Sequence, residues 1–216
     1  MAFSGSSANV AGLTGRDTNL ADLGASFLAI TATPGTGVIG HAAPTTFDET
    51  KPYFLLYNAG ALTIYPAFLK LHTTVVGVAG ARVQFTQAID SVNRWSSVGT
   101  ALTINNTNMA SNVISGATIR VGAPVATAAS PNRRVLSHRV YRAVIEVVED
   151  TYCFSWGSPS PGAPSNLISS GTTVTAFTHS YPALAIGPGQ SFLIHQWRAS
   201  QSTGPTFEVE FAYYEK

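Results

Sequence analysis

The stretch that decides the fold is Phe207–Tyr213, which reads FEVEFAY. Its large apolar side chains stand at every second position, and Glu208, Glu210 and Ala212 stand between them. Successive side chains of a β-strand point to opposite faces, so this alternation puts one face on a core and the other toward water or a partner. The stretch is therefore predicted to form an amphipathic β-strand.

The same period of two recurs upstream, over residues 62–71 and 82–86, and turn-forming residues separate such segments. Gly supplies positive φ angles and Pro presets a turn, so these breaks have a physical cause. About ten short strands at regular spacing are expected, which is typical of a sandwich or barrel. The predicted fold class is all-β, a jelly-roll-like antiparallel β-sandwich. The turn signals are Thr33-Pro34-Gly35, Asn58-Ala59-Gly60, Ser115-Gly116, Gly187-Pro188-Gly189 and Ser202-Thr203-Gly204-Pro205.

One valine-rich stretch, residues 140–148, fits helical spacing as well as strand spacing. The β-branched density of Val144–Val148 favours a strand. With Glu149-Asp150 as a turn and Thr151–Trp156 as a second strand, a hairpin is predicted.

The chain is expected to form one domain preceded by an arm. Residues 1–24 are small and polar, so they are predicted to be a flexible N-terminal arm, and residues 25–216 are predicted to form the sandwich. Asp17 or Thr18 is a candidate cap for one short helical turn that carries Leu20 and Leu23. The Pro/Gly/Ser-rich tract Gly157–Ser165 is interpreted as a surface loop.

Charged residues make up only 11% of the 216 residues, and the net charge is +1. A typical share is about 25%. With 45% hydrophobic residues, the composition excludes disorder for the bulk of the chain. It also argues against nucleic acid as a partner, because phosphate binding needs clustered cations. With no apolar run near ~18 residues and no secretion signal, no membrane partner is expected, and the protein is expected to be soluble and cytoplasmic.

A surface this poor in charge predicts burial in an assembly, because charged residues are depleted at interface cores. The rival interpretation is a neutral, Thr-rich β surface. Arg133, Arg134, Arg139 and Arg142 form the one basic concentration, and inter-subunit ion pairs or solvation are favoured for them over nucleic acid.

The search for chemistry indicates no cofactor and no metal, and an enzyme is not expected. The five histidines lack ligand-like spacing, and the best candidate, His195, is interpreted as a packed core histidine. Cys153 lies in an apolar strand context and is expected to be a buried thiol. Trp197, which shares a face with Leu193 and His195, is expected in the core. Trp95 is loop-like and is expected to be exposed.

The segment Ala183–Trp197 and the closing stretch Glu208–Glu215 resemble the last strands of small jelly-roll virion proteins of tailed bacteriophages. The composition, rich in Ala, Thr, Ser and Gly and poor in Lys, and the small polar arm also resemble head decoration, or cement, proteins. The resemblance implies a protein that docks on the outside of a capsid shell and stabilises it by bridging capsomers. The implied partners are the major capsid protein and further copies of the chain, with a trimer favoured and a dimer possible, on a virion assembled in the host cytoplasm.

Eight residues are the candidate contacts with the capsid or with other subunits. Two alternatives stay open: a receptor- or glycan-binding module of a phage tail or spike, which recognises its ligand through loop aromatics, and an enzyme of cupin-like fold. The candidate contact residues are Phe3, Leu13, Leu20, Leu23, Trp95, Arg133, Arg134 and Tyr214.

Overall fold

The computed structural model describes residues 18–31, 33–42, 46–142, 146–157, 165–169 and 172–216. Nearly all of its regular structure is β, as the sequence predicts. The described residues form sixteen strands rather than about ten, because several strands have only two or three residues and carry no readable alternation.

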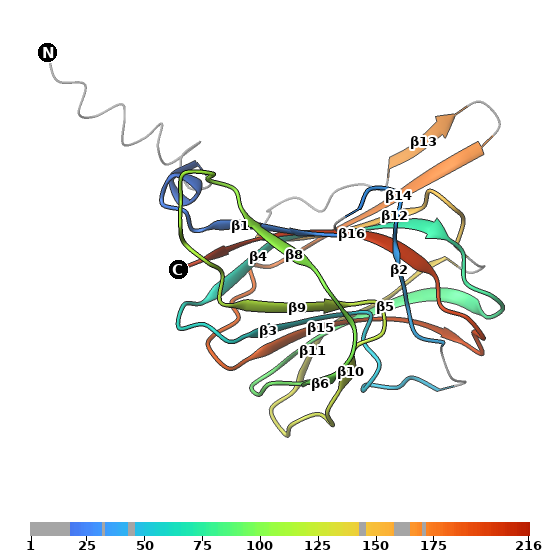
Figure 1. Cartoon of the computed structure of the whole chain (residues 1–216). Coiled ribbons are helices and arrows are strands. Elements are labelled where there is room, and N and C mark those ends of the chain that lie inside the picture. Colours follow the sequence, from blue (N-terminus) through green and yellow to red (C-terminus); the bar gives the residue numbers. More distant parts are fainter. Residues whose placement is uncertain (1–17, 32, 43–45, 143–145, 158–164, 170–171) are drawn as a thin grey trace, which may run out of the picture.

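Three sheets contain these strands. The larger two lie one above the other as layers (Figure 1). The eight-stranded sheet has the order β13 (Ser165–Ser169), β14 (Thr172–Tyr181), β12 (Thr151–Trp156), β4 (Ile64–Val75), β16 (Thr206–Glu215), β1 (Ser26–Ile30) and β8 (Thr103–Asn106), with β2 (Val38–Ile39) also paired to β16. The six-stranded sheet has the order β11 (Arg134–Arg142), β5 (Ala81–Asp90), β15 (Ser191–Ala199), β3 (Phe54–Asn58), β9 (Ala117–Val121) and β7 (Thr100–Ala101). The small sheet pairs β10 (Val125–Ala126) with β6 (Trp95–Ser97).

The pairings are antiparallel except that β12 and β14 run parallel. The predicted antiparallel β-sandwich is therefore confirmed, and the jelly-roll path stays a prediction.

The hydrophobic core lies between the two large sheets. Phe207, Val209, Phe211 and Tyr213 of β16 are fully buried, while the residues between them are only half-buried, which confirms the alternation read from FEVEFAY. The core joins the layers through rings: the Phe211 centroid lies 4.9 Å from that of Phe54 on β3. Full burial of such a side chain contributes about 1.5–3 kcal/mol, so this one strand supplies a large share of the cohesion between the sheets.

The hairpin predicted over residues 140–156 is wrong. Of its expected first strand, Val144–Val148, the described residues 146–148 are not in a strand. Its second strand exists as β12, but β12 pairs with β4 and β14 in the eight-stranded sheet, whereas the preceding strand, β11, pairs with β5 in the other sheet. Glu146 and Asp150 are buried in the connection between them. The backbone of Asp150 bonds that of Thr73, with the Thr73 N–H donating over 2.8 Å. A turn is present at Val148 and Glu149, close to the expected position, but it leads into a strand of the other sheet.

Trp197 also departs from the expectation. It shares a face of β15 with Leu193 and His195, but this face points away from the other sheet, and Phe192 and Ile194 face the core instead. Trp197 is half-buried there. The sequence shows which side chains share a face but not which face meets the opposite sheet, because both faces of β15 are apolar.

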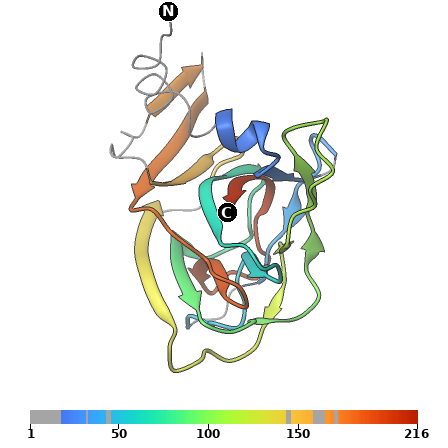
Figure 2. The ribbon, with the colours of Figure 1, turned by 90° about the vertical axis from the view of Figure 1, so that its left-hand side faces the viewer.

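At the start of the described chain, residues 18–22 form the short helical turn that the sequence predicts, closed by the Leu23 N–H donating to the Asn19 carbonyl over 3.0 Å. Both ribbon views place this turn beside the loop between β8 and β9 (Figures 1 and 2). Phe3, Leu13 and Asp17 lie outside the described residues, as do residues 158–164 of the predicted surface loop.

Candidate functional site

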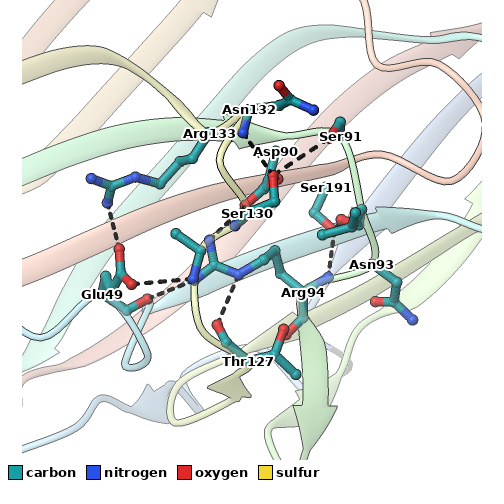
Figure 3. Close-up of polar contacts among 12 residues, drawn as sticks. Glu49, Asp90, Ser91, Asn93, Arg94, Thr127, Ser130, Asn132, Arg133 and Ser191 are labelled. Carbon is teal, nitrogen blue, oxygen red and sulfur yellow. Dashed lines mark hydrogen bonds and ion pairs between the residues drawn. The ribbon is translucent and has the colours of Figure 1, made fainter.

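A buried arginine organises one side of the six-stranded sheet (Figure 3). Arg94 Nη1 lies 2.9 Å from Asp90 Oδ2, its Nε donates to the Thr127 carbonyl over 2.8 Å, and its backbone N–H donates to Ser191 Oγ over 2.9 Å. A buried charge needs a partner and hydrogen bonds to offset its desolvation. Arg94 therefore clamps the loops after β5 and β10 onto β15.

The two carboxylates near Arg94, those of Asp90 and Glu49, both have hydrogen-bond and ion-pair partners in the same chain. Burial raises the pKa of Asp90, but hydrogen bonds from the Ser130 hydroxyl and backbone and from Arg94 outweigh it, so the pKa lies below its usual value. Glu49 accepts from the Ala129 N–H over 3.1 Å and pairs with Arg133 Nη1 over 2.8 Å. Arg133 therefore forms its ion pair within its own chain. Arg134 is exposed at the start of β11.

His195 lies beneath the segment that carries Glu49 and is buried, with Nε2 3.0 Å from the Glu49 carbonyl oxygen. Burial lowers its pKa to about 4, so the ring is neutral near pH 7 and Nε2–H can donate to that carbonyl. Within the described ranges, no group of three or more His, Cys, Asp or Glu side chains is placed to hold a metal ion.

Trp95 is not the exposed loop side chain that its sequence context predicts. It begins β6, is half-buried, and packs against the small cluster around Leu55 and Leu193. Its Nε1 donates to the Val98 carbonyl over 3.1 Å, and the guanidinium of Arg120 covers the ring 4.5 Å from its centroid. Trp95 therefore offers a poor platform for stacking on a sugar.

Large apolar side chains are exposed on two neighbouring segments, the turn before β1 and the loop between β8 and β9. Leu23 is 74% exposed, Ile114 89%, and Met109 is fully exposed; with Val113 they form what we call the arm-base patch. Asn106 fastens its two segments together, because its Nδ2 donates both to the Gly24 carbonyl over 2.8 Å and to the Val113 carbonyl over 3.1 Å. The patch therefore joins the turn before β1 to the loop between β8 and β9.

A shallow groove of about 190 Å³ runs into the arm-base patch and is lined by Phe27, Ile104, Asn106, Val113, Ile114 and Ser115. Leu20 lies nearby and is half-buried. Sequence reasoning identified Leu20 and Leu23 but missed Met109 and Ile114. The polar run Asn105–Asn108 indicates a loop there and was the available signal that Met109 would be exposed.

The outer face of the eight-stranded sheet carries a second group of exposed large side chains, which are aromatic. Tyr214 on β16 is half-buried and lies in register with Tyr65 on β4. Tyr65 and Phe68 are both exposed. Cys153 of β12 is on this face as well. It is half-buried rather than buried, because Tyr152 and Phe154 take the core side, and burial raises the pKa of its thiol.

Comparisons with protein-family models, curated proteins and solved structures found no match to this chain. Within the described part, no helix is long and apolar enough to cross a membrane. The geometry itself therefore has to support a function. The buried ion pairs serve the fold, whereas the arm-base patch and the outer sheet face leave apolar groups available for binding.

Proposed function

We propose that this chain is a structural protein of a tailed-bacteriophage virion, a capsid decoration or cement protein that binds the outer shell and stabilises it by bridging capsomers. In this proposal it is not an enzyme and needs no cofactor. Its partners are the major capsid protein and further copies of itself, and neither nucleic acid nor membrane. The supporting observation is the arm-base patch, which includes Leu23 at the end of the predicted N-terminal arm.

Exposed apolar groups in a cluster mark sites of interaction. Leu23, Met109 and Ile114 each gain about 1.5–3 kcal/mol on full burial, so contact with a shell subunit would recover free energy that the isolated chain leaves unused. Several arms on one oligomer then bind together, which multiplies weak contacts into tight attachment. Leu23 of the patch belongs to the predicted arm, residues 1–24, so a shell subunit that binds the arm can also contact the patch.

The distribution of charge supports an assembly role. Arg94 and Arg198, the largest buried side chains, are each paired with a carboxylate inside the chain. Several of the chain's few charged side chains are therefore buried, and covering the remaining charge-poor surface with another protein requires little desolvation of charge.

The proposal is tested by cosedimentation of the purified chain with empty shells of the virus that encodes it. Deletion of the residues before Leu20, and separately Leu23→Asp with Ile114→Asp, should abolish sedimentation with the shells and leave the folded domain intact. Val98→Asp is the matched control: Val98 is exposed outside the patch and has a φ of 48°, which Asp tolerates better than Val. Shell occupancy that is unchanged in both variants would reject the proposal.

A further inference from the structure

The outer face of the eight-stranded sheet has an ordered pattern across its central strands. Phe68 on β4 lies in register with Ala212 on β16, and Ala212 lies in register with Leu28 on β1. This row is apolar and combines large side chains with a small one. Ala67 is the extra residue at a register shift between the two strands, which is why Phe68 and Tyr65 both reach this face.

Two different rows flank the apolar row. On one side Lys70 pairs with Glu210, Nζ to Oε1 2.9 Å. On the other side lie the two tyrosines, Tyr65 and Tyr214, in register with each other. An apolar centre bordered by charged and polar groups is the usual composition of a protein–protein interface.

We propose that a second copy of this chain binds to this face, about a two-fold axis that runs parallel to β4 and β16 and midway between them. The inference rests on the self-association included in the proposed function and identifies its surface. Such an axis brings each β4 residue of one copy over a β16 residue of the other copy. That β16 residue is the one with which the β4 residue is in register within its own sheet. Lys70 then faces Glu210 of the second copy, and Phe68 faces Ala212 of the second copy.

The face is complementary to itself under this operation. The opposite charges of Lys70 and Glu210 meet twice across the axis, and the large Phe68 side chain meets the small Ala212 twice. The next strands outward also face each other across the axis, because β12 and β1 lie at equal distances from it. Cys153 on β12 then lies over Ile30 on β1 of the second copy. A single self-complementary patch gives a closed dimer.

The size of the face is sufficient for such a dimer. The six strands from β14 to β8 span about 24 Å at about 4.8 Å between strands, and the rows from Glu208 to Tyr214 span about 20 Å. Two such faces bury about 1,000 Å² together, the lower limit for a specific interface. Facing sheets pack about 10 Å apart, which leaves room for interleaved Phe and Tyr rings.

The first test is sedimentation equilibrium of the full chain and of two charge-reversed variants. The wild type should be a dimer. Lys70→Glu and Glu210→Lys should each weaken self-association at least tenfold, because like charges then meet across the axis. An equimolar mixture of the two variants should associate again as heterodimers, since the carboxylate introduced at position 70 faces the ammonium introduced at position 210.

The matched control is Arg82→Glu, an exposed charge reversal on β5 of the six-stranded sheet, which should leave the dimer unchanged. Circular dichroism verifies that every variant is folded. A monomeric or trimeric wild type, or a variant mixture that stays monomeric, would overturn the two-fold arrangement.

Cys153 provides a second measurement, because the chain has only this one cysteine and it lies on the proposed interface. Alkylation of the thiol should be severalfold faster in Lys70→Glu than in the wild type at concentrations where the wild type is dimeric. Equal rates would contradict the interface.

Shell cosedimentation separates the two proposals. A dimeric wild type that ignores shells rejects the decoration role and keeps the interface. A monomeric wild type that binds shells rejects the interface and keeps the role.

Discussion

Arg94 and Asp90 form an ion pair that is almost completely removed from solvent, with side chains 1% and 0% exposed and Nη1 2.9 Å from Oδ2. Arg94 also holds the Thr127 carbonyl and the Ser191 hydroxyl. The pair therefore connects two loops to the six-stranded sheet, and its loss should lower the free energy of unfolding.

Arg94→Ala is expected to lower the free energy of unfolding by about 3–5 kcal/mol, because it leaves the Asp90 carboxylate buried without its cation. Urea denaturation followed by tryptophan fluorescence measures the change. Arg134→Ala removes an exposed guanidinium and should stay within about 0.5 kcal/mol of the wild type. Equal effects of the two substitutions would show that the Arg94 network does not support the fold.

His195 should make stability depend on pH in mildly acidic solution. Its pKa is about 4 in the folded chain and 6.5 in the reference state. Between these values the unfolded chain binds a proton that the folded chain excludes, so stability falls as pH falls from 6.5 toward 4. The contribution lost is about 3 kcal/mol.

His195→Gln keeps a donor for the Glu49 carbonyl but does not titrate, so unfolding free energies measured from pH 7 to 4.5 should fall less steeply than those of the wild type. An identical slope in both proteins would contradict the assignment. Asp90 acts in a lower window: its folded pKa is depressed, so its contribution is lost only as pH falls through that pKa, below the ordinary value of 3.8.

Gly116 and Gly60 lie back to back where the loop after β3 meets the start of β9. A Cβ on Gly116 would stand 2.5 Å from Gly60 Cα, and the Ala59 N–H donates to the Gly116 carbonyl over 3.0 Å. Gly116→Ala is expected to lower the unfolding free energy by about 1–3 kcal/mol, because two backbones must separate. Thermal unfolding measures this effect.

Gly187→Ala is the matched control for that substitution. A Cβ on Gly187 would meet the Gln190 side chain at 3.4 Å, an ordinary contact, so the melting temperature should change little. A Gly116→Ala variant as stable as the Gly187→Ala variant would show that the close approach imposes no constraint.

The sequence located single strands and turns well, because both depend on neighbouring residues. The β16 alternation, the short helical turn at residues 18–22 and the shared face of Leu193 and Trp197 could all be read locally. The exposure of candidate contact residues was predicted less well. Trp95 looked exposed from its polar neighbours, but Arg120, 25 positions away in the chain, covers its ring.

The amino-acid sequence by itself therefore determined an all-β chain with one clear amphipathic strand and a neutral surface, since alternation and composition are properties of short stretches. Only the tertiary structure decided that β11 and β12 belong to different sheets, that Arg198 is neutralised by Glu146, and that the Asn108 side chain donates to the Asp22 carbonyl. The physical reason is that burial and ion pairing act between groups close in space, and the chain brings such groups together from distant positions.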